Sequence, residues 1–288
     1  MISPCYVCPN KCGTLRNDGA FGLCGSTNQI KIAKYYLHPF EEPIISGKNG
    51  SGTVFFTGCA LKCVFCQNYE LSRTLRGKTV SVKELSDIFK ELEDLGAHNI
   101  NLVTPSHYAY QIIEALSIYK PKIPIVYNTH GYELISTLKD LNEYVDVYLP
   151  DLKFKNPIVS KRYTGKENYF EIASNAIKFM MENKSTVIEN GLIKSGVIVR
   201  HLILPLSSND SVEIVKWFKQ NKKGGALFSL MAQYTPLGDI SGFKELSRHI
   251  TKTEYDRVLK ELYTLNENEC FIQSLSSAEK SYVPKWDF

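Results

Sequence analysis

The sequence predicts an α/β fold: a partial (β/α)6 TIM-type barrel with a small cysteine-rich extension at its amino end. From Thr53 onward, short apolar runs alternate with amphipathic segments, which is typical of a parallel sheet with right-handed crossovers. Six such units are too few to close an eight-unit barrel. Residues 1–30 lack periodic hydrophobicity and are rich in Cys, Gly and Asn. We therefore expect a cysteine-rich knuckle (1–30), a connection (31–50) and a barrel (51–288).

The composition is that of an ordinary globular protein, with 288 residues, 43% hydrophobic and 22% charged. Aromatic residues make up 11%, which argues against disorder. A formal net charge of +4 neither requires nor excludes an anionic partner, and we expect no nucleic acid. No stretch approaches the roughly 20 apolar residues of a membrane helix. Residues 1–12 carry cysteines and prolines where a secretory signal would be apolar, so we expect a cytoplasmic protein without a membrane partner.

Each unit of the predicted barrel pairs an apolar strand with an amphipathic helix. The strands are expected at 53–57, 100–103, 123–127, 145–149, 197–204 and 226–231. The helices are expected at 82–95, 108–119, 133–141, 169–181, 212–221 and 254–264. The first helix has a capping box at Ser81 and Glu84, and Thr253 with Asp256 gives the last helix a similar signal. Prolines and glycines make 31–50 an irregular connection.

The strongest functional signal is the loop Cys59-Ala-Leu-Lys-Cys63-Val-Phe-Cys66, directly after the first barrel strand. The carboxyl ends of parallel strands are where α/β folds build active sites. Thiolates suit iron–sulfur clusters or zinc. Three of them leave one iron of a [4Fe-4S] cluster open for a small molecule, whereas structural zinc needs a fourth local ligand. No histidine lies near the loop in sequence. A cluster is therefore favoured, and a zinc knuckle or buried free thiols is the alternative.

The loop and the barrel together resemble the radical S-adenosylmethionine (SAM) enzymes. The ending Cys66-Gln67-Asn68 is similar to that of their glycyl-radical-activating branch. Further stretches, spread over nearly the whole chain, resemble the homologues of pyruvate formate-lyase activating enzyme. They are Glu41-Glu42-Pro43, Gly50-Ser51-Gly52-Thr53, Gly96-Ala97-His98-Asn99-Ile100-Asn101, Val103-Thr104-Pro105-Ser106-His107, Tyr148-Leu149-Pro150-Asp151 and Val199-Arg200-His201-Leu202.

The resemblance implies a mechanism and a set of partners. Cys59, Cys63 and Cys66 would hold a [4Fe-4S] cluster that binds SAM at its open iron. Reductive cleavage of SAM would yield a 5′-deoxyadenosyl radical, which abstracts hydrogen from the substrate. The implied substrate is a peptide or protein. A glycyl radical enzyme is the favoured candidate, because the motifs resemble those of the activating enzymes. The implied electron donor is of the flavodoxin or ferredoxin type.

Family motifs at the strand ends imply further site residues. Those implied for cofactor binding are Asn68, Thr104, His107, Asn128, Thr129, Arg200 and His201. The substrate-side candidates are Asp151, Lys153, Gln233 and Tyr234. The second strand departs from the family, because Thr104-Pro105-Ser106-His107 stands where Gly-Gly-Glu is common. Each assignment has a structural alternative. The Asn and Thr residues could cap helices, and Asp151 and Lys153 could form a surface ion pair. The two histidines could be loop or core residues.

A second cysteine constellation, Cys5-x2-Cys8-x3-Cys12-x11-Cys24, occupies the amino-terminal knuckle. Four thiolates can surround zinc or hold an auxiliary [4Fe-4S] cluster. Four local ligands leave no open position, which slightly favours zinc. The alternative is a partly ordered tail without metal. Cys270 stands alone in an apolar run and is expected in the core.

Two classes of function therefore compete. The first is a radical SAM enzyme, which either activates a glycyl radical enzyme or modifies a peptide, for example as an epimerase. The second is a non-catalytic adaptor whose cysteines bind metal for structure only. The number of ligands in the 59–66 loop discriminates between them, because a structural zinc site is closed by four ligands.

Overall fold

The computed structural model describes residues 4–266 and 269–278. Within them, the six strands that match the predicted ones run parallel, in the order in which they occur along the chain. They are β2 (Ser51–Phe56), β4 (Ile100–Val103), β5 (Ile125–Thr129), β6 (Val147–Pro150), β8 (Leu192–Leu202) and β9 (Leu227–Met231). The predicted fold class is thus confirmed as an α/β fold with a parallel, unclosed sheet.

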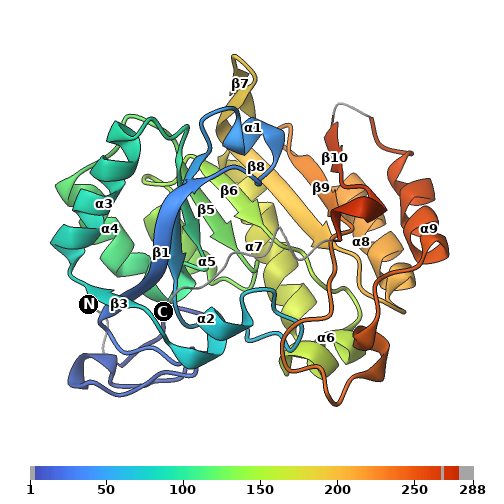
Figure 1. Ribbon diagram of the computed structural model, residues 1–288, viewed down its shortest axis with the longest axis horizontal. Helices are drawn as coiled ribbons and strands as arrows, with labels where there is room; N and C mark the ends of the chain where they lie inside the picture. Colours follow the sequence, from blue (N-terminus) through green and yellow to red (C-terminus); the bar gives the residue numbers. More distant parts are fainter. Residues whose placement is uncertain (1–3, 267–268, 279–288) are drawn as a thin grey trace.

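The helices cover the outer face of the curved sheet (Figure 1). Crossovers between the parallel strands contain α3 (Val82–Asp94), α4 (Ala109–Ile118), α5 (Ile135–Leu141), α6 (Pro157–Thr164), α7 (Tyr169–Asn183) and α8 (Ser208–Asn221). Two further helices are α2 (Tyr69–Thr74), after the 59–66 loop, and α9 (Lys252–Leu262), which packs on α8. No described helix has the length and apolar character needed to cross a membrane.

Local sequence signals explain where these helices begin. Ser81 and Glu84 form the expected capping box of α3, which satisfies amide groups that the first turn leaves unpaired. At α9 the predicted cap is wrong. The box is formed by Thr251 and Glu254, so the helix begins earlier than Thr253. The sequence contains two capping signals two residues apart, Thr251 with Glu254 and Thr253 with Asp256. Arg248 also donates to the Glu254 carboxylate, which favours the first of them.

The segment 31–50 is not an irregular connection. It contains most of β1 (Ile30–His38), which pairs antiparallel with β2 and with β3 (Lys78–Val80). The prolines and glycines of this segment lie beyond the end of β1, so they end the strand without preventing it. Two other strands were also missed, β7 (Val187–Glu189), antiparallel to β8, and β10 (Cys270–Ile272), parallel to β9.

A short helix, α1 (Pro43–Ser46), closes the amino end of the barrel. Its Ile45 is fully buried in a cluster with side chains of β5, β6, β8 and β9, among them Val126 and Ile198. Asn99, just before β4, donates to the Ile45 carbonyl over 2.7 Å. Because apolar packing and this hydrogen bond both fix α1, the residues that precede it are held inside the barrel.

Candidate active site

A cavity of about 760 Å³ lies inside the curve of the sheet. It reaches from the 59–66 loop, at the carboxyl edge, to the residues that precede α1. Twelve of the sequence-predicted site residues line it: Cys59, Cys63, Cys66, Asn68, Thr104, Asn128, Thr129, Asp151, Lys153, Arg200, Gln233 and Tyr234. The fold therefore brings together side chains from the ends of all six parallel strands, as the strand-end motifs predict.

The cysteine loop is held tightly where it leaves β2. Gly58 has φ +85°, and a Cβ at this position would collide with Ser26, so only glycine fits here. The amide of Cys59 donates to the Cys24 carbonyl over 3.0 Å, and the Leu61 amide donates to Cys59 Sγ over 3.4 Å. The loop is thus fixed by backbone contacts before any metal binds.

All three thiols of the loop are buried or half-buried. Burial raises the pKa of Cys59 to about 11, and it also raises the pKa values of Cys63 and Cys66, which the neighbouring Lys153 ammonium opposes. Thiolates in such surroundings need a cation to stabilise them. Among the described residues, no group of three or more His, Cys, Asp and Glu could hold a single metal ion as it stands. A cubane is larger than one ion and spaces its ligands further apart.

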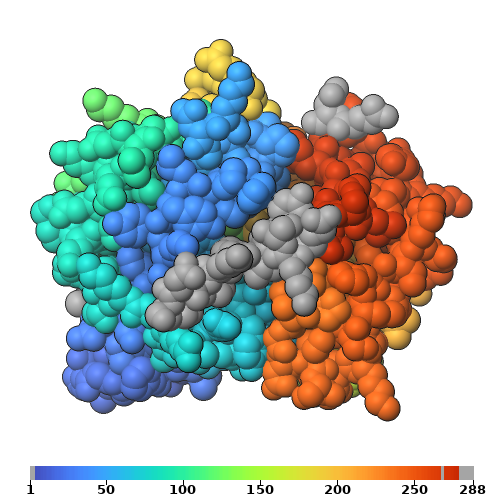
Figure 2. All heavy atoms as spheres, viewed as in Figure 1, coloured from blue at the N-terminus to red at the C-terminus, as the bar shows by residue number. Residues whose placement is uncertain are grey.

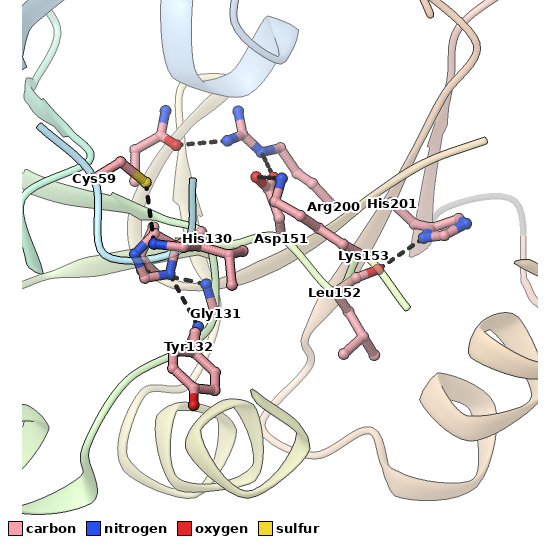
Figure 3. Close-up of polar contacts among 12 residues, drawn as sticks. Cys59, His130, Gly131, Tyr132, Asp151, Leu152, Lys153, Arg200 and His201 are labelled. Carbon is pink, nitrogen blue, oxygen red and sulfur yellow. Dashed lines mark hydrogen bonds and ion pairs between the residues drawn. The ribbon is translucent and has the colours of Figure 1, made fainter. Parts of the chain in front are cut away.

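A charged network lines the cavity next to this loop (Figure 3). Arg200 donates from Nε to Asp151 Oδ1 (3.0 Å), from Nη1 to Glu41 Oε2 (3.1 Å) and from Nη2 to Asn128 Oδ1 (2.5 Å). Lys153 Nζ contacts Asp151 Oδ2 at 2.6 Å. Burial alone would raise the pKa of Asp151, but Arg200 and Lys153 together bring it below its ordinary value. Asp151, Lys153 and Arg200 are therefore charged at neutral pH, and their charges partly offset one another.

Two carboxylates of the cavity were missed as site residues. Glu41 and Glu42 were noted only as part of a resembling stretch, yet both line the cavity. Glu41 Oε1 accepts from Asn101 Nδ2 (3.0 Å) and Asn128 Nδ2 (3.3 Å). Two adjacent acidic residues directly before Pro43, ahead of the first apolar strand of the barrel, were a signal that could have found them, because carboxylates that become buried need partners.

His107 and His201 do not line the cavity, which corrects their expected placement beside a cofactor. His107 Nε2 lies 2.8 Å from the Thr57 carbonyl, and burial lowers its pKa to about 3. The His201 ring contacts the Leu152 carbonyl at 2.7 Å, and burial lowers its pKa to about 4. Figure 3 shows His201 beside Leu152, away from the Arg200 guanidinium. Neighbours on a strand point to opposite faces, so Arg200 and His201 could not both face the cavity.

The four amino-terminal cysteines do not line this cavity. Cys5, Cys8 and Cys24 are buried and Cys12 is half-buried. Burial raises the pKa of Cys8 to about 12, and nearby Cys24 and Cys5 add to this effect. The Cys12 sulfur accepts from Thr14 Oγ1 over 3.2 Å.

The cysteine-rich unit packs directly on the cysteine loop of the barrel. Besides the bond from Cys59 to Cys24, Asn10 Nδ2 donates to the Ala60 carbonyl over 2.8 Å. On the barrel side, Thr137 Oγ1 donates to the Val7 carbonyl over 2.8 Å. Figure 2 shows the unit in dark blue as a lobe against the cyan segment that follows β2. The hydrogen bond between Cys59 and Cys24 thus links a cysteine of the loop directly to a cysteine of the amino-terminal unit.

Comparisons with known proteins agree with this arrangement. The family model of the radical SAM superfamily matches residues 53–218. An uncharacterized protein of Methanocaldococcus jannaschii, MJ0674, is 29% identical over 276 residues, which cover 91% of this chain and 75% of that protein.

Solved structures show the same fold. Streptococcus suis SuiB bound to S-adenosylmethionine matches with a TM-score of 0.53 and 14% identity, over 77% of this chain and 50% of SuiB. SuiB bound to its precursor peptide SuiA matches with a TM-score of 0.52 and 14% identity, over 76% of this chain and 48% of SuiB. This chain therefore spans about half the length of SuiB. On the match of the family model to more than half of its residues, the chain belongs to the radical SAM superfamily.

Proposed function

We propose that this protein is an enzyme that cleaves SAM reductively at a [4Fe-4S] cluster held by Cys59, Cys63 and Cys66. The observation that supports this most is that these three cysteines, and no other described cysteine, line one cavity at the carboxyl edge of the sheet. Their soft sulfur donors fit iron. When bound, the cluster would supply the electron that splits the sulfonium of SAM into methionine and a 5′-deoxyadenosyl radical.

The other residues of the cavity would position SAM and exclude water. Asn68, Thr104, Asn128 and Thr129 offer hydrogen bonds near the cysteine loop. Arg200 already uses donors on all three of its nitrogens within the protein. It would therefore act chiefly by orienting Asn128 and the carboxylates, while Asp151, Lys153, Gln233 and Tyr234 face the substrate.

We further propose a peptide or protein as substrate. The motifs of the loop and strand ends favour activation of a glycyl radical enzyme, and a flavodoxin or ferredoxin would then supply the electron. SuiB, a protein of similar fold, has been crystallised with a precursor peptide, which favours peptide modification, such as epimerisation, as a second candidate. Fold alone does not choose between them.

Anaerobic reconstitution with iron and sulfide tests the proposed chemistry. We expect a brown protein that, with dithionite, forms 5′-deoxyadenosine from SAM, measured by liquid chromatography and mass spectrometry. Incubation with candidate partner proteins carrying deuterated glycine should then transfer the label into 5′-deoxyadenosine. A colourless protein with zinc firmly bound in the 59–66 loop would instead support a non-catalytic adaptor.

We also propose that Cys5, Cys8, Cys12 and Cys24 hold a metal centre of their own within a separate amino-terminal unit. The neighbouring Arg16 is 6% exposed. Its Nη1 lies 3.7 Å from Cys5 Sγ and donates to the His107 carbonyl over 2.7 Å. Within the described chain it forms no ion pair with a carboxylate. Its Nε and Nη2 donate to the Thr27 carbonyl, so carbonyl groups satisfy its hydrogen bonds. A metal with four thiolates is anionic and would supply the opposite charge that a buried guanidinium favours.

Elemental analysis of the triple variant Cys59→Ala/Cys63→Ala/Cys66→Ala tests this centre without interference from the barrel cluster. We expect about one zinc or about four irons per chain to remain, and the addition of Cys8→Ala to remove them. Metal-free protein before that addition would contradict both forms of the centre.

A further inference from the structure

The charged groups of the cavity can be counted in pairs. Glu41, Asp151, Lys153 and Arg200 form a closed set of two anions and two cations, joined by contacts of 2.6–3.1 Å. Buried ions persist when each has a partner of opposite charge. The charges of this quartet are therefore balanced without a ligand.

Glu42 stands outside that quartet. It is 9% exposed and lines the cavity. Its Oε2 has no hydrogen-bond partner among the described residues, and the hydroxyl of Ser229 is the side-chain contact that favours its ionised form. Burial raises the pKa of this carboxyl; Arg200 opposes the rise and Glu41 adds to it. Because Arg200 is already shared by Glu41 and Asp151, the protein gives Glu42 no cation of its own.

Glu42 enters the cavity from the amino end of the barrel, where it directly precedes α1. Its carboxyl contacts Ser229 of β9, which pairs with Arg200 of β8. The proposed function places the ammonium of SAM at the open iron of the cysteine loop, which follows the carboxyl end of β2. An oxidised cubane with three thiolates is anionic and SAM is cationic, so their charges offset each other. The negative charge of Glu42 is then left without a positive partner.

We propose that the Glu42 end of the cavity is a subsite for a cationic group of the substrate, an alkylammonium or guanidinium such as a lysine or arginine side chain carries. The proposal rests on the proposed function and names the chemistry of its substrate. Phe55, Leu202 and Met231 also line the cavity, and apolar walls of this kind suit the methylene stem of such a side chain. The cation would supply the charge and the hydrogen bond that Glu42 lacks.

Ligand-observed NMR on the reconstituted protein with SAM tests the subsite with four small probes: n-butylammonium, n-butylguanidinium, butyramide and butyrate. We expect the two cations to bind at least tenfold more tightly than the neutral and anionic probes. Glu42→Gln should weaken the cations at least tenfold, and Glu42→Asp should keep part of their affinity. Glu167→Gln, at an exposed carboxylate outside the cavity, is the matched control and should change nothing.

Equal binding of butyramide and butylammonium to the unsubstituted protein would overturn the proposal, even if a variant failed to fold. Unchanged cation affinity in folded Glu42→Gln would overturn it as well. The production of 5′-deoxyadenosine by the same preparation is scored separately. If SAM is cleaved and the cations show no preference, only the subsite is wrong, whereas absence of cleavage would reject the proposed function.

Discussion

Replacement of Cys63 by alanine is expected to abolish SAM cleavage and to remove about four irons per chain, with the colour they give, from the reconstituted protein. Two remaining thiolates cannot hold three irons of a cubane. The side chain lies in a loop whose backbone is fixed by other contacts, among them the Cys59–Cys24 hydrogen bond of 3.0 Å, so the barrel should stay folded. The measurements are iron content, 5′-deoxyadenosine yield and the far-ultraviolet circular dichroism spectrum.

The matched control for this variant is Cys270→Ala. Cys270 belongs to β10 but does not line the cavity, so its variant should keep the iron, the colour and the cleavage. Undiminished cleavage in Cys63→Ala would show that the open-iron argument has the wrong ligands. Loss of iron in both variants would show that the effect is not specific to the loop.

Replacement of Arg200 by methionine is expected to lower the free energy of unfolding by about 3–5 kcal/mol. The change leaves Glu41 and Asp151 buried without the guanidinium that lies 3.1 and 3.0 Å from them. Urea unfolding at pH 7, followed by circular dichroism, measures the loss. The loss should shrink toward pH 4, because Asp151 loses the guanidinium that holds its pKa below the ordinary value, and its carboxylate becomes neutral in the variant as the pH falls.

Arg162→Met provides the comparison at an exposed ion pair. The Arg162 side chain is 49% exposed and contacts Glu245 at 2.8 Å, so its loss should cost no more than about 1 kcal/mol. An equally small loss for Arg200→Met would mean that the buried network adds no more stability than a surface ion pair. A loss that grows as the pH falls would contradict the prediction as well.

The sequence predicted the parallel strands because each is a short apolar run followed by an amphipathic helix, and Ile100–Val103 has the expected bounds. β1 was missed because its exposed and half-buried positions break the apolar pattern. The prolines that follow it also indicated a loop. Its position depends on hydrogen bonds with β2 and β3. Such long-range pairing leaves little trace in a local pattern.

The sequence could predict the site residues that lie at strand ends. It could not predict those on segments outside the strand–helix units of the barrel. Asn128, Asp151 and Arg200 were named from family motifs at strand ends, and the rule that carboxyl ends converge explains why they line one cavity. Glu41 and Glu42 enter the cavity from the opposite end of the barrel, through the packing of Ile45. No spacing in the sequence relates them to Arg200, which lies 159 residues beyond Glu41.

The order of the sheet has one more consequence. Its two edges are β10 and β3, and within the described residues they do not pair with each other. Among the described residues, no strand-to-strand hydrogen bonds therefore join the two edges, so a change in the curvature of the sheet would not have to break any such bond between them.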